Sequence, residues 1–123
     1  MNDELITAAR EFARRYSTHA DLARDLEDWS CRVLLAADDA SETITLTVEG
    51  GRVTGISTSR QDEAQVDGER NALTVTAARA VLLDILALRL NPNQPYVFGE
   101  LTVRGDEADF LRVDYIASTL CAR

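Results

Sequence analysis

Histidine is scarce in this sequence, and the scarcity limits the catalysis that it could support. His19 is the only histidine among 123 residues, so a serine or cysteine nucleophile would have to find its base among carboxylates. No nucleophile-elbow pattern surrounds any serine. The two carboxylate clusters, at 38–39 and 106–109, fit a turn and the first turn of a helix. We therefore expect a protein that is not an enzyme, with His19 at the surface or at a helix end.

Cysteine is almost as rare. Cys31 and Cys121 are the only two, and they form no Cys-x-x-Cys spacing. Disulfide frameworks and zinc sites need more numerous or more closely spaced cysteines. The sequence therefore predicts two reduced, unpaired thiols, no metal site and no cofactor.

Long hydrophobic runs are absent as well. No stretch reaches the roughly 18 uninterrupted apolar residues typical of a membrane-spanning helix. The first residues, Met1 to Glu4, carry acids where a signal peptide carries bases, and residues 121–123 are not a peroxisomal Ser-Lys-Leu signal. These features predict no integral membrane segment and a cytoplasmic location.

Positive charge is in short supply. The sequence has 13 lysines and arginines against 21 aspartates and glutamates, for a formal net charge of −8. A negative field of this kind repels phosphate backbones and anionic bilayers. We expect no nucleic-acid partner, and we interpret the acidity as a contribution to solubility.

Apolar residues at helical spacing are present from the start of the chain. From Asp3 to about His19 they recur every three or four positions, Leu5 and Tyr16 among them. This pattern predicts an amphipathic helix with Asp3 as its N-cap. Residues 20–28 fit either a second short helix or a continuation of the first.

The apolar pattern then changes to the alternation typical of β-strands. Residues 29–37 have apolar side chains on both faces, which predicts a central strand, and residues 43–49 alternate apolar residues with threonine. Gly50-Gly51 follows, and both glycines tolerate the positive φ that a two-residue hairpin needs. Residues 52–58 return as a third strand, in which we interpret Gly55 as a bulge.

An apolar helix dominates the second half. A polar loop over 59–71 leads to a strand at 72–76, and Thr76 is expected to cap a helix that runs to about Leu90, before Pro92. Because this helix is apolar nearly all round, most of its circumference must be buried. It is either the core helix of a small domain or one side of a ligand pocket.

The end of the chain adds a strand and a helix. Residues 96–104 predict a fifth strand, and Asp106 is expected to cap a closing helix with one apolar stripe. The whole chain, 1–123, is thus predicted to form one α+β domain. Its expected architecture is a mixed five-stranded sheet with helices packed on one face.

The segment 98–106 carries a family pattern. It reads Phe-Gly-Glu-Leu-Thr-Val-Arg-Gly-Asp, and a Leu-Asn-Pro turn at 90–92 precedes it. This arrangement resembles the sterol carrier protein type-2-like family, in which a strand of pattern Gly-x-Leu-x-Ile-x-Gly-Asp leads into the closing helix. The matching residues are Gly99, Leu101, Val103, Gly105 and Asp106. Two features depart from the family: Asn91 replaces a usual aspartate, and the chain is acidic where well-known carriers are basic.

The resemblance implies that an apolar tunnel between sheet and helices receives a sterol, a fatty acid or another acyl chain without changing it chemically. Helical and strand positions then select the side chains expected to line this tunnel. Those of the apolar helix are Val81, Leu82, Ile85 and Leu86; those of the closing helix are Phe110, Val113, Ile116 and Leu120; those of the strand are Phe98, Leu101 and Val103.

A second class of function stays open. Small acidic α+β chaperones of bacterial secretion systems have a comparable size, charge and element order, and they work as dimers. A protein-interaction module that forms a homodimer is therefore the alternative to a carrier whose partner is an apolar small molecule. The glycine-containing run at 99–106 favours the carrier, whereas the charge of −8 favours the module.

Overall fold

The computed structural model describes residues 4–40, 42–59 and 72–121. Five helices and five strands lie in these ranges. In chain order they are α1 (Glu4–Ser17), α2 (Ala20–Asp25), β1 (Cys31–Ala37), β2 (Glu42–Glu49), β3 (Arg52–Ser59), β4 (Ala72–Ala77), α3 (Arg79–Leu86), α4 (Asn93–Val97), β5 (Leu101–Arg104) and α5 (Glu107–Cys121). The expected N-cap Asp3 and most of the expected loop at 59–71 lie outside the described residues.

The strands form one sheet in the order β3-β2-β1-β4-β5. β1 pairs with β4 in parallel, and the remaining pairs are antiparallel. β1 is central, and residues 33–37 are buried on both faces of the sheet, as their continuous apolar pattern predicts. The mixed five-stranded sheet is therefore confirmed.

The β2–β3 hairpin turns at Gly50 and Gly51, whose φ angles are 59° and 76°. A Cβ atom on Gly51 would lie 2.4 Å from the carbonyl oxygen of Leu26, so no larger residue fits there. The register shifts between Thr47, which faces Gly55, and the next pair. The strand is thus bulged as expected, but the extra residue is Thr54, next to Gly55, and not Gly55 itself.

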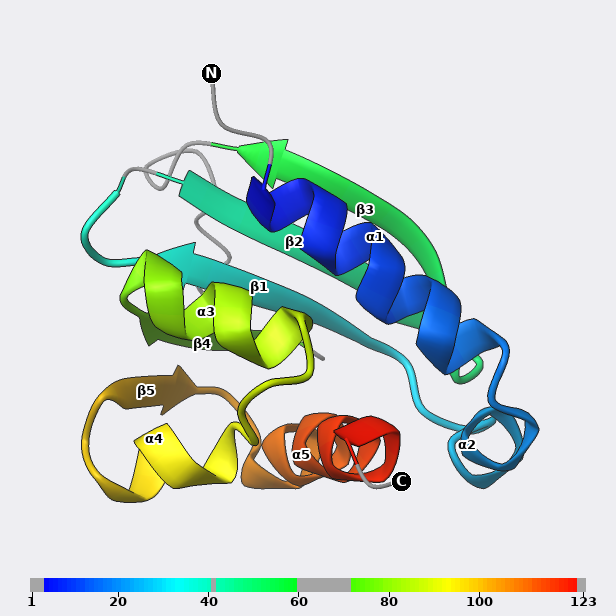
Figure 1. The fold of residues 1–123 in the computed structure, drawn as a ribbon. Coiled ribbons are helices and arrows are strands. Elements are labelled where there is room, and N and C mark those ends of the chain that lie inside the picture. Colours follow the sequence, from blue (N-terminus) through cyan, green and yellow to red (C-terminus); the bar gives the residue numbers. More distant parts are fainter. Residues whose placement is uncertain (1–3, 41, 60–71, 122–123) are drawn as a thin grey trace.

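The helices cover one face of the sheet (Figure 1). α1 packs against β2, β3 and α3, and α3 packs against β1. The inward-facing residues of β1, β2 and β4 meet the apolar faces of α1, α3 and α5 in one core cluster. None of the described helices is long and apolar enough to cross a membrane.

The apolar helix is shorter than predicted, and its cap is different. Thr76 belongs to β4, where it pairs with Ala36 and Thr102. Helix α3 begins at Arg79, whose backbone N–H donates to Asp39 Oδ1 at 2.9 Å. The turn after β1 thus supplies the capping oxygen, and a distant residue of this kind cannot be identified from local pattern.

The predicted strand at 96–104 was wrong in its first half. Helix α4 occupies Asn93–Val97, and β5 begins only at Leu101. Pro92 is the N-cap of α4 and already has helical φ and ψ. Its missing N–H costs nothing there, because the first N–H groups of a helix have no intrahelical acceptor. Asp106 caps α5 as predicted, because its Oδ1 accepts from the backbone N–H of Ala108 at 2.9 Å.

Candidate functional site

A small cavity of about 30 Å³ lies between the sheet and the helices. Five residues of β1, β2 and β3 form its sheet side. Side chains from α1, α3 and α5 cover it, together with Trp29 from the segment before β1. The lining residues are Phe12, Tyr16, Trp29, Val33, Leu35, Leu46, Val48, Val53, Ile85, Leu86, Val113 and Ile116. No charged side chain is among them, so the cavity suits an apolar ligand.

Two lining side chains carry a polar atom, and they differ in their surroundings. Trp29 Nε1 donates to Asp109 Oδ1 at 2.9 Å. The Tyr16 hydroxyl is buried and, among the residues that the structure describes, has no hydrogen-bond partner. Burial raises the pKa of Tyr16 to about 12, so this hydroxyl is protonated at neutral pH.

The structure brings four of the predicted tunnel residues to this cavity. They are Ile85 and Leu86 of α3, and Val113 and Ile116 of α5. Helical spacing placed each pair on one face of its helix, and the two faces meet across the cavity.

The other predicted residues lie elsewhere in the core or outside it. Leu82, Leu101 and Phe110 are buried, and the half-buried residues Val81, Val103 and Leu120 pack against the core. Phe98 is 74% exposed at the C-terminal end of α4, away from the cavity.

The first half of the chain contributes lining residues that were not predicted from the sequence. Phe12 and Tyr16 of α1 line the cavity together with inward-facing residues of β1 and β2. Their signal was present, because both lie on the apolar face of α1 and Val33 and Leu35 lie on one face of β1. The pattern did not indicate which helix would lie over which strands.

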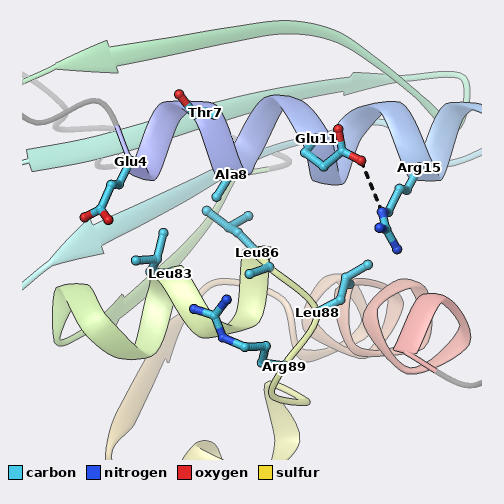
Figure 2. Close-up of a pocket in the computed structure, with 10 residues that line it drawn as sticks. Glu4, Thr7, Ala8, Glu11, Arg15, Leu83, Leu86, Leu88 and Arg89 are labelled. Carbon is cyan, nitrogen blue, oxygen red and sulfur yellow. Dashed lines mark hydrogen bonds and ion pairs between the residues drawn. The ribbon is translucent and has the colours of Figure 1, made fainter.

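A larger groove of about 640 Å³ lies at the surface where α1 runs beside α3 (Figure 2). Leu83, Leu86, Ala87 and Leu88 from the α3 side and Ala8 from α1 form its apolar part. The polar lining residues are Glu4, Thr7, Glu11, Arg15 and Arg89. The groove thus joins an apolar base to charged edges, as a site for an amphiphile requires.

Leu86 belongs to both spaces. It lines the surface groove and also the internal cavity, and it is only 2% exposed. Figure 2 shows its side chain between α1 and α3. Leu86 is thus a point at which the wall of the groove and the wall of the cavity share a side chain.

Leu88 has an unusual backbone conformation at the same groove. Its φ is 64°, and among the described residues it is the only non-glycine with positive φ. The backbone N–H of Arg89 donates to the carbonyl oxygen of Asp84 at 2.8 Å, which closes the C-terminal end of α3. Glycine usually occupies such a position, so a leucine here costs conformational energy and adds apolar surface to the groove.

The charged edges of the groove are neutralised by neighbours. Glu11 accepts hydrogen bonds from Arg14 and Arg15, and these bonds lower its pKa to about 2. Arg89 donates to Asp84 at 2.7 Å. The edges are therefore polar but carry little net charge.

The described residues offer little for catalysis. His19 Nδ1 accepts from the backbone N–H of Leu22 at 3.4 Å, so the histidine caps α2, which confirms the expected helix-end position. No group of three metal-ligating side chains is found in the described ranges. Cys31 and Cys121 form no disulfide in the part of the chain that the structure describes.

The sequence and the fold were compared with known proteins. The model of the SCP-2 sterol transfer family matches residues 10–117. A search of curated proteins gave no match.

Several solved structures share the fold. The sterol carrier protein domain 2 of Helicoverpa armigera is 10% identical, with 98% of this chain and 90% of that chain covered and a TM-score of 0.64. Palmitated SCP2L2 from Aedes aegypti is 15% identical, with 94% and 92% covered and a TM-score of 0.60. The ubiquinone synthesis protein UbiJ-SCP2 is 16% identical, with 94% of each chain covered and a TM-score of 0.64. At these identities the likeness shows the fold alone.

Proposed function

The chain belongs to the SCP-2 sterol transfer family, and on this basis we propose that it binds an apolar, lipid-like ligand and leaves it chemically unchanged. The ligand is a sterol, a fatty acid or another acyl chain, held in a tunnel between the sheet and helices α3 and α5. The observation that carries the proposal is the cavity in which side chains of the sheet, α1, α3 and α5 meet without a charged group.

The volume of this cavity sets a condition on binding. About 30 Å³ is roughly the share of one water molecule in the liquid, so an acyl chain does not fit without movement of the lining. The groove between α1 and α3, at about 640 Å³, lies within the range of roughly 300–1,000 Å³ typical of ligand pockets. We infer that the ligand enters through the groove and displaces Leu86 to reach the cavity.

Helix α5 is the second element expected to move. Its half-buried residues Val113 and Leu120 pack at the edge of the core. Polar contacts hold it in place: Tyr115 donates to Asp25 at 2.7 Å, and Cys121 Sγ lies 3.2 Å from the carbonyl oxygen of Leu88. Phe110, Ile116 and Ala117 of α5 are buried in the core as well, so a displacement of this helix would have to break apolar packing together with these two contacts.

The test uses Trp29, the only tryptophan of the chain, which lines the cavity. We expect its fluorescence to change when a fluorescent fatty acid or a long-chain alcohol is titrated into the protein. Replacement Val113→Phe fills the cavity and should weaken binding at least about tenfold, since overpacking leaves no room for ligand. Leu111→Phe is the matched control, because Leu111 is 56% exposed on the same helix.

Two results would contradict the proposal. One is an unchanged Trp29 signal at saturating concentrations of every apolar probe. The other is binding that Val113→Phe and Leu111→Phe weaken equally, because the internal cavity would then not be the site.

A protein-interaction module is the second candidate, and exposed apolar side chains favour it. Val97, Phe98 and Leu111 of α4 and α5 are between 56% and 74% exposed, and exposed apolar residues of this size are typical of contact surfaces. Native mass spectrometry of gently purified protein separates the candidates. A lipid carrier should appear as a complex with a co-purified small apolar molecule, whereas a protein-interaction module should appear as a dimer without any bound small molecule.

A further inference from the structure

The exposed apolar side chains of the protein gather on two neighbouring helices. Within the ranges that the structure describes, the large hydrophobic side chains that are exposed are Tyr96, Val97, Phe98, Leu111 and Tyr115. Val97 and Phe98 are the most exposed, at 68% and 74%, and they are the last residue of α4 and its C-cap. We call Tyr96, Val97 and Phe98 the α4 tip.

The α4 tip lies in a segment without charge. The ten residues from Leu90 to Gly99 include no aspartate, glutamate, lysine or arginine, although 28% of the whole chain is charged. A charged side chain loses much of its hydration when it enters apolar surroundings. The segment avoids this cost, so its exposed side chains can leave water easily.

The backbone of the tip is already hydrogen-bonded. The N–H of Phe98 donates to the carbonyl oxygen of Gln94 at 3.3 Å, and that of Gly99 donates to the carbonyl oxygen of Tyr96 at 3.2 Å. Backbone groups that enter a bilayer must find their partners within the protein. These two N–H groups meet that condition before any contact with lipid.

The tip is a supported protrusion. The ring of Tyr96 packs on Phe110 with centroids 4.9 Å apart, and Pro95 beside it is buried. Gly99 has a φ of 78°, and a Cβ atom placed there would have no atom within 4 Å. The chain therefore turns in open space, and Figure 1 shows this turn between α4 and β5 at the outer edge of the fold.

We propose that the α4 tip inserts into the surface of a lipid bilayer without net charge. A bilayer accepts a convex apolar tip without a shaped pocket, and tyrosine favours the boundary between lipid and water. A second copy of the chain fits less well, because two molecules of net charge −8 repel each other. The same exposed side chains favour the interaction module, but the convex shape and the absence of charge favour a lipid surface. This inference goes beyond ligand binding and does not depend on it.

The proposal fixes how the binding depends on lipid and salt. One myristoyl chain gives an association constant of only about 10⁴ M⁻¹, and we expect a tip of three side chains to bind more weakly still, so the test needs millimolar lipid. Because the tip is uncharged and the protein is acidic, vesicles of phosphatidylcholine should bind at least as well as vesicles that also contain phosphatidylserine. Added salt should leave the binding to phosphatidylcholine nearly unchanged.

The experiment places a fluorescent reporter at the tip with Phe98→Trp. On addition of phosphatidylcholine vesicles its emission should move to shorter wavelength, and brominated phosphatidylcholine should quench it. Leu111→Trp is the matched control, because Leu111 is 56% exposed on α5 outside the tip and its emission should not change. Both variants keep Trp29, whose contribution is measured on the wild type.

A second pair of variants measures the affinity by flotation with the same vesicles. Replacement of both Val97 and Phe98 by serine should lower the partition coefficient at least about tenfold, the order expected for one buried phenylalanine. Leu111→Ser should leave it unchanged. Because all three side chains are mostly exposed, the melting temperatures should stay close to that of the wild type.

Four results would overturn the proposal. Two are an emission of Phe98→Trp that millimolar lipid leaves unchanged, and an equal response of Leu111→Trp. A third is a shift that needs phosphatidylserine and disappears at high salt, because a basic surface would then bind the lipid. The fourth is a shift that follows protein concentration without vesicles, because a second copy would then cover the tip. None of these results affects the ligand-binding proposal, which is tested without vesicles through Trp29.

Discussion

Trp29 and Asp109 are 80 positions apart in the sequence, yet their side chains form a hydrogen bond of 2.9 Å between Nε1 and Oδ1. The bond joins the segment before β1 to the first turn of α5. Arg112 lies 3.6 Å from the same carboxylate, whose side chain is 13% exposed. Since Trp29 lines the internal cavity, this bond ties one side of the candidate site to α5, the helix that the proposed function expects to move.

Asp109→Ala should therefore loosen α5. The loss of a partly buried hydrogen bond to a charged group is expected to lower the free energy of unfolding by about 1.5–3 kcal/mol. The same change should speed the exchange of a bound fluorescent fatty acid, measured by stopped flow. Glu107→Ala is the control, because it removes the same charge from the same helical turn and leaves the bond to Trp29 intact. Equal effects of the two variants would mean that charge, not the bond, holds the helix.

Leu86→Ala should open a path between the surface groove and the cavity. Leu86 lines both spaces, whereas Leu83 lines only the groove. We expect Leu86→Ala to raise the rate constant for ligand association several-fold and Leu83→Ala to leave it nearly unchanged, as measured by the Trp29 signal after rapid mixing. If both variants bind at the wild-type rate, the ligand enters by another route.

The elements that follow from local pattern were predictable from the sequence. The apolar spacing of α1, the glycines of the hairpin and the cap Asp106 each depend on residues close in the chain. Helix α4 was missed because it depends on tertiary contact: its Tyr96 ring packs on Phe110 with centroids 4.9 Å apart. An isolated segment of this length has little intrinsic helical stability.

The candidate site was predictable only in part, for a related reason. Helical spacing identified Ile85, Leu86, Val113 and Ile116, because each pair shares one face of a helix. Tyr16 could not be assigned in the same way. Its place at the cavity depends on how α1 crosses the sheet, and this information is carried by long-range packing.

Ile85→Ala tests whether the cavity is a site or only a packing defect. Ile85 is 5% exposed, so its truncation should lower the free energy of unfolding of the unliganded protein by about 2–5 kcal/mol. The enlarged cavity should accept ligand more easily, so a saturating long-chain alcohol should restore part of this loss. Leu120→Ala, outside the cavity, should cost less and should gain no more from ligand than the wild type does. Chemical denaturation with and without the alcohol measures both quantities.

Alkaline pH should destabilise the fold, and Cys31 should be responsible for the first part of the effect. Burial, with a smaller contribution from Asp109, raises the pKa of the Cys31 thiol from 9.0 to about 12. Between these values the unfolded chain releases the thiol proton while the folded chain keeps it, so the free energy of unfolding falls as the pH rises. The pKa of Tyr16 rises from 10.0 to about 12 and extends the fall at higher pH.

Cys31→Ala should accordingly reduce the fall in the free energy of unfolding between about pH 9 and about pH 10. In this range the Cys31 thiol of the unfolded chain ionises, whereas the Tyr16 phenol ionises mainly at higher pH. Urea midpoints at a series of pH values measure this slope. Cys121→Ala keeps Cys31 and should retain most of the decline.

In the native protein at neutral pH, Cys31 should react with a thiol reagent far more slowly than it does in denaturant, because a buried, protonated thiol is a poor nucleophile. A Cys31 that reacts equally fast in both states would mean that its thiol is not protected by burial in the native protein.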